Sequence, residues 1–368
     1  MRILYFTRDY TPHDHRFLTS LARTGNEVFS LRLERRSLQL EDRPLPPEVK
    51  QVIWRGGRVP FRWKDAPGIY FDLQRVTRSL KPDLIHAGPI PTVSFLAALS
   101  GFRPLVSMSW GSDLLRDIDL SRWQMGRAKF ALKRTSVLVG DCQAVKERAA
   151  SLGFPQERVR LFPWGVDLDQ FCPGDSADFR ERRGWQDAFV LLSTRSWEAL
   201  YGVDVLVKAF ARAHAQAQEL RLILIGSGSQ AVIIRKLILE HGLEGDVFLA
   251  GQAKNSDLPG YYRSADLYLS ASHSDGTSVS LLEALASGCP VLVSDIAGNK
   301  EWITPGQEGW LFPDGDVEAL AQGILHALSQ RDQLAEKGAA ARRLAENRAD
   351  WRKNFNVLLE AYRMAVEH

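Results

Sequence analysis

The sequence predicts an α/β chain of two doubly wound domains, each with a mostly parallel sheet. Short apolar runs rich in Val, Ile and Leu alternate with longer amphipathic stretches along the chain. The runs are continuously apolar rather than alternating, which is typical of strands covered by helices on both faces. The pattern pauses once, over residues 161–179, where Pro, Gly and Asp are frequent. The length of 368 residues is enough for two such domains.

The expected strands follow one another in chain order. In the first half they are 2–7, 27–33, 51–54, 83–88, 104–110 and 136–141, and in the second half 189–195, 220–226, 247–251, 267–272 and 290–295. A helix is predicted over 203–217, where apolar positions recur at helical spacing without Pro or Gly. We expect an N-terminal domain over 1–165, a linker over 166–178 and a C-terminal domain over 179–349. Two Rossmann-like domains facing a cleft would bind ligands at the carboxyl ends of their strands.

Composition excludes several classes of protein. Hydrophobic residues make up 45% of the chain and charged residues 25%, which excludes a disordered, collagenous or coiled-coil chain. The formal net charge of +3 argues against a nucleic-acid binder. Three widely spaced cysteines without a CxxC pair argue against a disulfide scaffold or a zinc site. With no signal-peptide pattern and no apolar run of membrane-spanning length, we expect a cytoplasmic protein that is at most associated with a membrane surface.

The net charge is unevenly distributed. Residues 1–180 carry a net charge of +8 and residues 181–368 a net charge of −5. The basic excess is densest over 32–64, a stretch that also holds Trp54, Phe61 and Trp63. Basic residues mixed with aromatic ones suit peripheral contact with an anionic membrane. An ordinary solvated face with a few packed aromatic side chains explains the same pattern, so both interpretations stay open.

The most informative segment covers residues 270–303. A strand ends in the polar loop 273–278, and a helix follows with Ser278 as its N-cap. The amides of Thr277, Ser278 and Val279, after Gly276, would be free to bind an anion such as a phosphate.

Two acidic residues flank this predicted anion site. Glu283 lies about one turn, roughly 5.4 Å, further along the helix, a suitable step from a phosphate to the hydroxyl pair of a ribose. Asp275 lies on the loop side, where a group beyond the phosphates would sit. Alternatively, Asp275 only caps the loop and Glu283 is a solvated helix residue. The second alternative fits poorly, because Glu283 lies in the largely apolar stretch LLEALA.

This segment resembles the E-x7-E motif of the retaining GT-B glycosyltransferases of family four, and the resemblance extends over nearly the whole chain. It implies that Asp275 and Glu283 handle the donor, with Asp in place of the usual first Glu. Residues 189–210 resemble the strand, loop and helix that bind the donor diphosphate, with Arg195 as the cation and Tyr201 where Lys is usual. Gly226 and Gly228 correspond to the family's Gly-rich turn, and Leu249 and Gly251 to its base-binding region. The resemblance also implies that residues 350–368 pack back on the N-terminal domain.

The N-terminal half departs more from the family. Trp110, before Gly111 and Asp113, stands where many members have a His that contacts the donor sugar. The first loop lacks the family's paired glycines, and its residues His13, His15 and Arg16 are candidates for binding the acceptor. Three D-x-D strings, at 117–119, 167–169 and 314–316, are matches of a kind that arises by chance among 44 acidic residues, and the resemblance implies catalysis without a metal.

The predicted function is glycosyl transfer with retention, from a nucleotide-diphosphate sugar to an acceptor hydroxyl. The resemblance implies no prosthetic group, a UDP or GDP sugar as donor, and a glycan, a lipid-linked molecule or a small molecule as acceptor. Catalytic roles are expected for Asp275, Glu283 and Arg195. The substitutions at Trp110, Tyr201 and Asp275 leave open a catalytically impaired sugar-nucleotide-binding protein or partner subunit, and the fold also leaves open a nucleotide-sugar epimerase.

Overall fold

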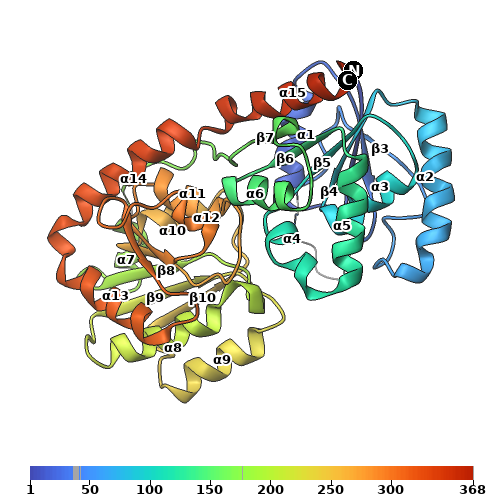
Figure 1. Ribbon diagram of the computed structural model, residues 1–368. Coiled ribbons are helices and arrows are strands. Elements are labelled where there is room, and N and C mark those ends of the chain that lie inside the picture. The colour runs from blue at the N-terminus through green and yellow to red at the C-terminus, as the bar shows by residue number, and fades with distance from the viewer. Residues whose placement is uncertain (36–40, 42, 176, 368) are drawn as a thin grey trace. The chain divides into compact units, whose positions relative to one another are not determined.

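The computed structural model describes residues 1–35, 41, 43–175 and 177–367. The chain divides into two compact units, which we describe separately (Figure 1). Unit 1 contains Met1–Phe162 and Phe355–His368, and unit 2 contains Pro163–Asn354. The described part of the predicted linker 166–178 therefore falls within unit 2, while residue 176 lies outside the described residues. Each unit holds one parallel sheet with helices, which confirms the predicted fold class.

The sheet of unit 1 has seven strands in the order β3-β2-β1-β4-β5-β6-β7. All neighbouring strands pair in parallel. Their bounds are β1 Arg2–Thr7, β2 Glu27–Arg32, β3 Lys50–Gln51, β4 Leu84–Gly88, β5 Leu105–Met108, β6 Val137–Gly140 and β7 Val159–Leu161. The edge strand β3 is shorter than the predicted strand 51–54, because Trp54 turns away into the core and donates its indole N–H to the carbonyl of Arg32.

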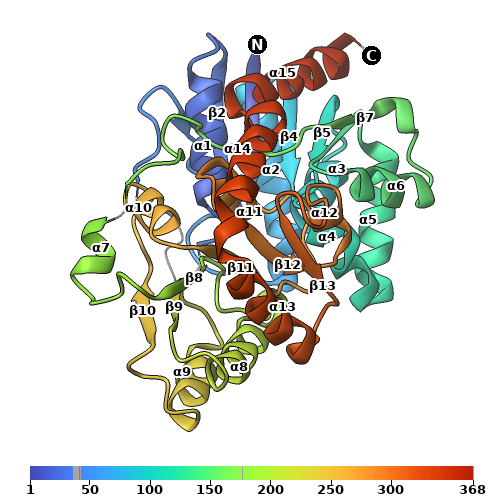
Figure 2. The ribbon, with the colours of Figure 1, turned by 90° about the vertical axis from the view of Figure 1, so that its left-hand side faces the viewer.

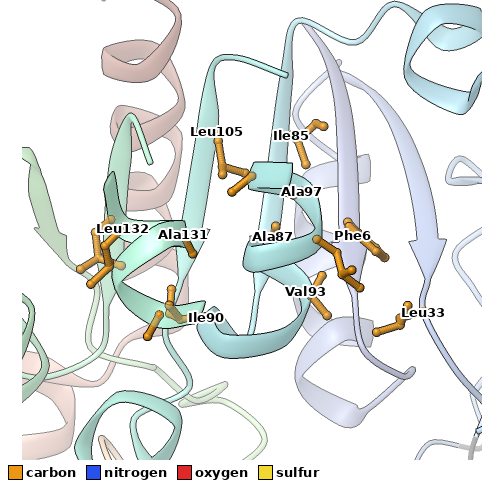
Figure 3. Packing of buried hydrophobic residues seen from close by; sticks show 14 of the residues in the cluster. Phe6, Leu33, Ile85, Ala87, Ile90, Val93, Ala97, Leu105, Ala131 and Leu132 are labelled. Carbon is orange, nitrogen blue, oxygen red and sulfur yellow. The ribbon is translucent and has the colours of Figure 1, made fainter. Parts of the chain in front are cut away.

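Helices cover this sheet on both sides. They are α1 Pro12–Ala22, α2 Ala66–Leu80, α3 Phe95–Leu99, α4 Ser112–Leu115, α5 Arg122–Arg134, α6 Gln143–Ser151 and, from Phe355 onward, α15 Trp351–Glu367, with short turns η1 Trp63–Asp65, η2 Ile90–Ser94, η3 Asp117–Leu120 and η4 Gln156–Arg158. Figure 3 shows the side chains of Val93 and Ala97 against the sheet residues Phe6 and Ala87, all within one buried cluster. The small alanines let the helical layer approach the sheet closely.

The sheet of unit 2 has six parallel strands in the order β10-β9-β8-β11-β12-β13. Their bounds are β8 Phe189–Ser193, β9 Leu220–Ile225, β10 Val247–Gly251, β11 Leu267–Ser270, β12 Val291–Ser294 and β13 Gly309–Phe312. The sequence did not predict β13, in which Trp310 and Leu311 are only partly buried.

The helices of unit 2 pack on both faces of its sheet. They are α7 Ala177–Glu181, α8 Val203–His214, α9 Ala231–Glu240, α10 Leu258–Arg263, α11 Val279–Ala286, α12 Ala297–Lys300, α13 Val317–Ser329 and α14 Leu334–Arg348, with η5 Ala199–Tyr201 and η6 Arg331–Gln333. The predicted helix 203–217 is α8, which ends slightly earlier. Helix α14 packs along α11 (Figure 2), and α11 is fully buried from Leu281 to Ala286.

Candidate functional site

Three loops meet at the carboxyl edge of the sheet in unit 2. Strand β8 lies between β9 and β11, so the segments that follow these strands are neighbours in space. They carry Arg195 after β8, Gly226 after β9, and the loop 271–278 after β11. Carboxyl edges of parallel sheets are where doubly wound folds place their ligands.

Arg195 is the centre of a hydrogen-bonded cluster on these loops. Its Nη1 donates to the hydroxyls of Ser278 at 2.7 Å and Ser280 at 3.0 Å. Its Nη2 pairs with Oδ2 of Asp275 at 2.6 Å. Burial, the largest single effect, lowers the pKa of Arg195, but the charge and hydrogen bond of Asp275 together with Tyr201 and Tyr268 outweigh it and raise this pKa. The guanidinium therefore stays positively charged, and its buried Nε has no hydrogen-bond partner among the described residues.

Tyr201 lies against this guanidinium. The Cζ atom of Arg195 sits 4.1 Å from the centre of the Tyr201 ring, a cation–π contact. At the position where the family usually has Lys, this chain therefore presents an aromatic face to Arg195 in place of a second cation.

The turn before α11 packs closely against Gly298, a residue that the sequence did not indicate as part of the site. A Cβ on Gly298, at the start of α12, would lie 2.1 Å from the carbonyl oxygen of Gly276 and 2.8 Å from that of Asp275. Only glycine allows this approach. Asp275 also accepts from the amide of Gly276 at 3.0 Å, so the turn is fixed on both sides.

Ser278 is the N-cap residue of α11, as predicted, but its side chain makes no capping hydrogen bond. It accepts from Arg195 instead, and the predicted anion-binding residues Thr277 and Val279 flank it. The positive end of the helix dipole and the Arg195 cation thus both favour negative charge at the N-terminus of α11.

Glu283 lies one turn into α11 and is buried, with 9% of its surface exposed. The hydroxyl of Tyr262 in α10 lies 2.8 Å from its Oε2. The same hydroxyl lies 2.9 Å from Thr194 Oγ1 and 3.2 Å from the carbonyl oxygen of Ser280. Burial and the charge of Glu283 raise the pKa of Tyr262, so its hydroxyl stays protonated and available as a donor.

A second buried tyrosine supports the Arg195 side of the cluster. Tyr268 of β11 donates its hydroxyl to Ser280 Oγ at 2.9 Å, and Ser280 accepts from Arg195. Tyr262, Tyr268, Ser280 and Gly298 were not among the predicted site residues. They come from four separate elements, and only the fold brings them to Arg195 and Glu283.

Gly226 and Gly228 let the turn after β9 pack against the segment after β8. A Cβ on Gly226 would lie 2.7 Å from the carbonyl oxygen of Arg195, and one on Gly228 would lie 2.4 Å from that of Trp197. Gly226 also donates its amide to the carbonyl of Gly251 at 2.8 Å, at a bulge in β10 after Leu249. The predicted turn and the predicted base-binding region are thus adjacent.

In unit 1 the structure brings several predicted residues to the ends of β4 and β5. The ring of Trp110 lies 5.6 Å from that of His13 and 6.2 Å from that of Phe17, measured between centroids. Gly111 adopts a φ of 83°, which favours glycine. Gly88 leaves room for the indole, since a Cβ there would lie 3.0 Å from Trp110 Nε1.

Asp113 is buried beneath this group. It accepts from Ser109 Oγ at 2.6 Å and from the amides of Ile90 and Trp110 at 2.7 and 2.9 Å. Burial, which outweighs these hydrogen bonds, raises the pKa of Asp113 to about 6. Its contacts fix the turn that carries Trp110.

The other candidates on the first loop have local contacts. Asp14 forms a capping box with Thr11 at the start of α1 and accepts from the hydroxyl of buried Tyr5 at 3.0 Å. His15 Nδ1 lies 2.7 Å from the hydroxyl of Tyr10. Arg16 is half-buried, and its positive charge partly offsets the rise that burial and Asp14 cause in the pKa of Tyr5. Of this loop, His13 is the residue that the structure places against Trp110.

His86 is a core residue. It is 1% exposed, stacks on Tyr5 and lies 2.6 Å from the hydroxyl of Tyr362 in α15. Burial lowers the pKa of His86 to about 3, so the ring is neutral.

The three D-x-D strings are engaged elsewhere. Asp119 pairs with Arg148, Asp169 pairs with Arg352, and Asp316 caps α13. Among the described residues, no group of three or more His, Cys, Asp or Glu side chains could hold a metal ion.

Comparison with protein families matches both halves of the chain. The model described as "Glycosyltransferase Family 4" matches residues 13–170, and the one described as "Glycosyl transferases group 1" matches residues 175–347. The chain belongs to this glycosyltransferase family. The predicted family membership is therefore confirmed.

Curated relatives are similar over part of their length. A D-inositol 3-phosphate glycosyltransferase of Thermobispora bispora is 32% identical over 58% of this chain and 52% of its own length. A GDP-mannose-dependent alpha-(1-6)-phosphatidylinositol monomannoside mannosyltransferase of Mycolicibacterium smegmatis is 25% identical over 74% of each chain. The chain thus spans only about half the length of the first of these relatives.

Solved structures share the fold. HepE of Anabaena in complex with UDP-glucose has a TM-score of 0.81 at 19% identity, over 98% of this chain and 99% of its own. Sucrose-phosphate synthase of Thermosynechococcus elongatus has a TM-score of 0.82 at 18% identity, over 99% and 98%. At these identities the likeness establishes the GT-B fold of this family member.

Proposed function

We propose that this chain transfers a sugar from a nucleoside-diphosphate sugar to an acceptor hydroxyl, with retention of configuration at the anomeric carbon. One observation carries the proposal: Arg195, with an unused buried N–H donor, lies at the N-terminus of the helix that also carries Glu283. The diphosphate would bind Arg195 and the N-terminus of α11. Glu283 would accept the ribose hydroxyls, and Asp275 would face the sugar.

In this mechanism the bond between the anomeric carbon and the diphosphate oxygen breaks first. Arg195 and the helix dipole stabilise the negative charge that develops on the leaving group. The acceptor oxygen then bonds to the same face of the oxocarbenium-like carbon, and its proton passes to an oxygen of the leaving diphosphate. In unit 1, Trp110 and His13 are the proposed contacts of the acceptor.

The relatives' names support the choice of substrates. They include a GDP-mannose-dependent enzyme and enzymes that act on inositol 3-phosphate or on a phosphatidylinositol mannoside. We therefore propose a UDP or GDP sugar as donor. A polyol hydroxyl, free or lipid-linked, is the proposed acceptor, in the synthesis of a cell-envelope glycoconjugate. A lipid-linked acceptor would require at least peripheral contact with a membrane.

The first test is a thermal-shift screen of UDP, GDP and ADP sugars, since a bound ligand stabilises the folded state. The selected donor is then incubated with acceptors, and the anomeric configuration of the product is read by NMR. Arg195→Ala and Glu283→Ala should each abolish transfer, while Arg235→Ala on the exposed face of α9 should not change it.

Four results would contradict the proposal. Donor binding without transfer or hydrolysis would indicate an impaired binding protein, and conversion of the donor without any acceptor would indicate an epimerase. An inverted product would rule out the retaining mechanism. Unchanged turnover in both Arg195→Ala and Glu283→Ala would refute the site.

A further inference from the structure

Helix α5 of unit 1 has an unusual exposed face. Its residues 122–134 include five Arg or Lys and no Asp or Glu. Arg122, Lys129 and Lys133 are exposed and follow one another at spacings of seven and four, which places them on one stripe of the helix. Beside this stripe the Trp123 side chain is 82% exposed, and Leu120 just before the helix is 63% exposed.

This face is continuous with the described part of the basic stretch 32–64. The guanidinium of Arg127 lies 3.9 Å from the ring centre of Trp63. Trp63 contacts Phe95 at 6.0 Å, and Phe95 contacts Phe130 of α5 at 5.4 Å, between ring centroids. Within residues 53–64 the exposed side chains besides Trp63 include, in chain order, Ile53, Arg55, Arg58, Val59, Arg62 and Lys64. Residues 36–40 and 42 of the stretch lie outside the described residues.

An open depression of about 420 Å³ lies on the other side of the basic stripe. Arg122 and Lys129 line it together with the apolar side chains of Ile118 and Met125. Asp119 also lines it, but its carboxylate is paired with Arg148. The depression therefore combines two cations with an apolar floor, which suits a phosphate attached to a hydrocarbon chain.

We propose that residues 53–64 and 118–133 form one surface that docks on an anionic phospholipid bilayer, with a headgroup phosphate in the depression beside Arg122 and Lys129. Trp123, Trp63 and Leu120 would enter the interfacial region, where aromatic rings are favoured. The cations would meet the negative surface potential. A nucleic acid would match the cations but would leave Leu120 and Ile53 exposed to water. No described helix is long and apolar enough to cross a membrane, so this contact is peripheral. Lipid binding of this kind does not depend on the proposed glycosyl transfer.

The test is flotation of the full chain with vesicles, one set of phosphatidylcholine alone and one that also contains phosphatidylglycerol. The chain should float with the anionic vesicles only. Each basic side chain near such a surface contributes about fivefold to binding, so neutralising two of them lowers the partition coefficient about twenty-five-fold, and reversing their charge lowers it further. Arg122→Glu with Lys129→Glu should therefore lose flotation, and Trp123→Ser should weaken it.

A matched control uses α9 of unit 2, which also exposes apolar side chains beside cations, among them Val232, Arg235 and Lys236. Arg235→Glu with Lys236→Glu makes the same change in net charge and should leave flotation unchanged. Urea unfolding of every variant should match the parent, because all these positions are exposed.

Several outcomes would overturn the proposal. They are equal binding to neutral vesicles, no flotation at all, and equal losses in the α5 and α9 variants. A fourth is a dimer, seen by sedimentation velocity, that Trp123→Ser disrupts while vesicles remain unbound. That last result would assign the surface to a second copy of the chain.

Discussion

Replacing Tyr262 with Phe tests whether Glu283 reads the ribose of the donor. The hydroxyl that is lost lies 2.8 Å from Glu283 Oε2, and both groups are buried. A hydrogen bond to a charged group contributes about 2 kcal/mol, so the free energy of unfolding should fall by about this amount. The Glu283 carboxylate also loses the hydrogen bond that orients it, so we expect its interaction with the two ribose hydroxyls to weaken.

The assay compares the affinity for a nucleoside diphosphate with that for its 2′-deoxy form, by titration calorimetry. In the parent chain the deoxy form should bind more weakly, because one acceptor contact of Glu283 is missing. In Tyr262→Phe this ratio should shrink about tenfold, equivalent to about 1.4 kcal/mol. A purely structural role would lower the stability and leave the ratio unchanged.

The control is Tyr268→Phe. Tyr268 is equally buried, and it also loses one hydrogen bond, but its hydroxyl contacts the neutral Ser280 rather than Glu283. It should lower the affinity for both nucleotides alike and keep their ratio. If Tyr262→Phe keeps the parent's ratio, or if both variants change it equally, the assignment of Glu283 to the ribose through Tyr262 is refuted.

Three further changes test other parts of the two units. Gly298→Ala should lower the free energy of unfolding by about 2 kcal/mol and weaken nucleotide binding, since its Cβ would meet the carbonyls of Gly276 and Asp275. The control is Gly260→Ala in α10, where a Cβ meets nothing within 4 Å, and it should change neither quantity. Urea unfolding with and without nucleotide measures both quantities for the two variants. Asp275→Asn leaves the buried Arg195 without its charge partner and should cost about 2 kcal/mol in urea unfolding, whereas Asp204→Asn, which breaks the more exposed pair with Lys208, should cost less than about 0.5 kcal/mol. Protonated Asp113 stabilises unit 1, and because its pKa rises from 3.8 to about 6 on folding, this contribution is complete below pH 4 and is lost as pH rises through about 6. The contribution that is lost amounts to about 3 kcal/mol of the free energy of unfolding. In Asp113→Asn the free energy of unfolding should therefore change with pH by about 3 kcal/mol less than in the parent chain. An unchanged pH dependence would contradict a raised pKa for buried Asp113.

The parts that the sequence predicts well are those in which one short segment carries all the information. The loop and helix at 270–286 hold Asp275, Ser278 and Glu283 in one short continuous segment, so their proximity follows from the continuity of the chain and the start of α11. The parallel strands are equally legible, because burial on both faces requires continuous apolar runs. By contrast, β3, β7 and β13 are short edge strands with positions that are not fully buried. The sequence predicts neither β7 nor β13, and β3 only partly overlaps the predicted strand 51–54.

The residues that could not be predicted act across the sheet. Tyr262 follows β10, and Tyr268 lies in β11, yet their hydroxyls meet on Ser280 at the start of α11. Nothing in the spacing of these tyrosines indicates that contact, because it depends on which strands are neighbours and on the side chain's reach. In the first loop, His13, His15 and Arg16 stay predicted contacts of the acceptor, whereas Asp14 between them caps α1.

The Arg195–Asp275 pair limits how the proposed donor site can hold a diphosphate. A carboxylate at 2.6 Å already neutralises most of the field of the guanidinium. With Tyr201 in place of a second cation, the net charge of this cluster without a ligand is close to zero. A diphosphate would then be held mainly by the unused Nε donor of Arg195 and by the N-terminus of α11, unless Asp275 turns away to meet the sugar. Binding of the sugar and release of Arg195 would be coupled in that case, since one carboxylate cannot serve both. A nucleoside diphosphate without its sugar should therefore bind less tightly than the complete donor, and Asp275→Asn should remove this difference. Equal affinities for the two ligands in the parent chain would show that Asp275 stays on Arg195 throughout.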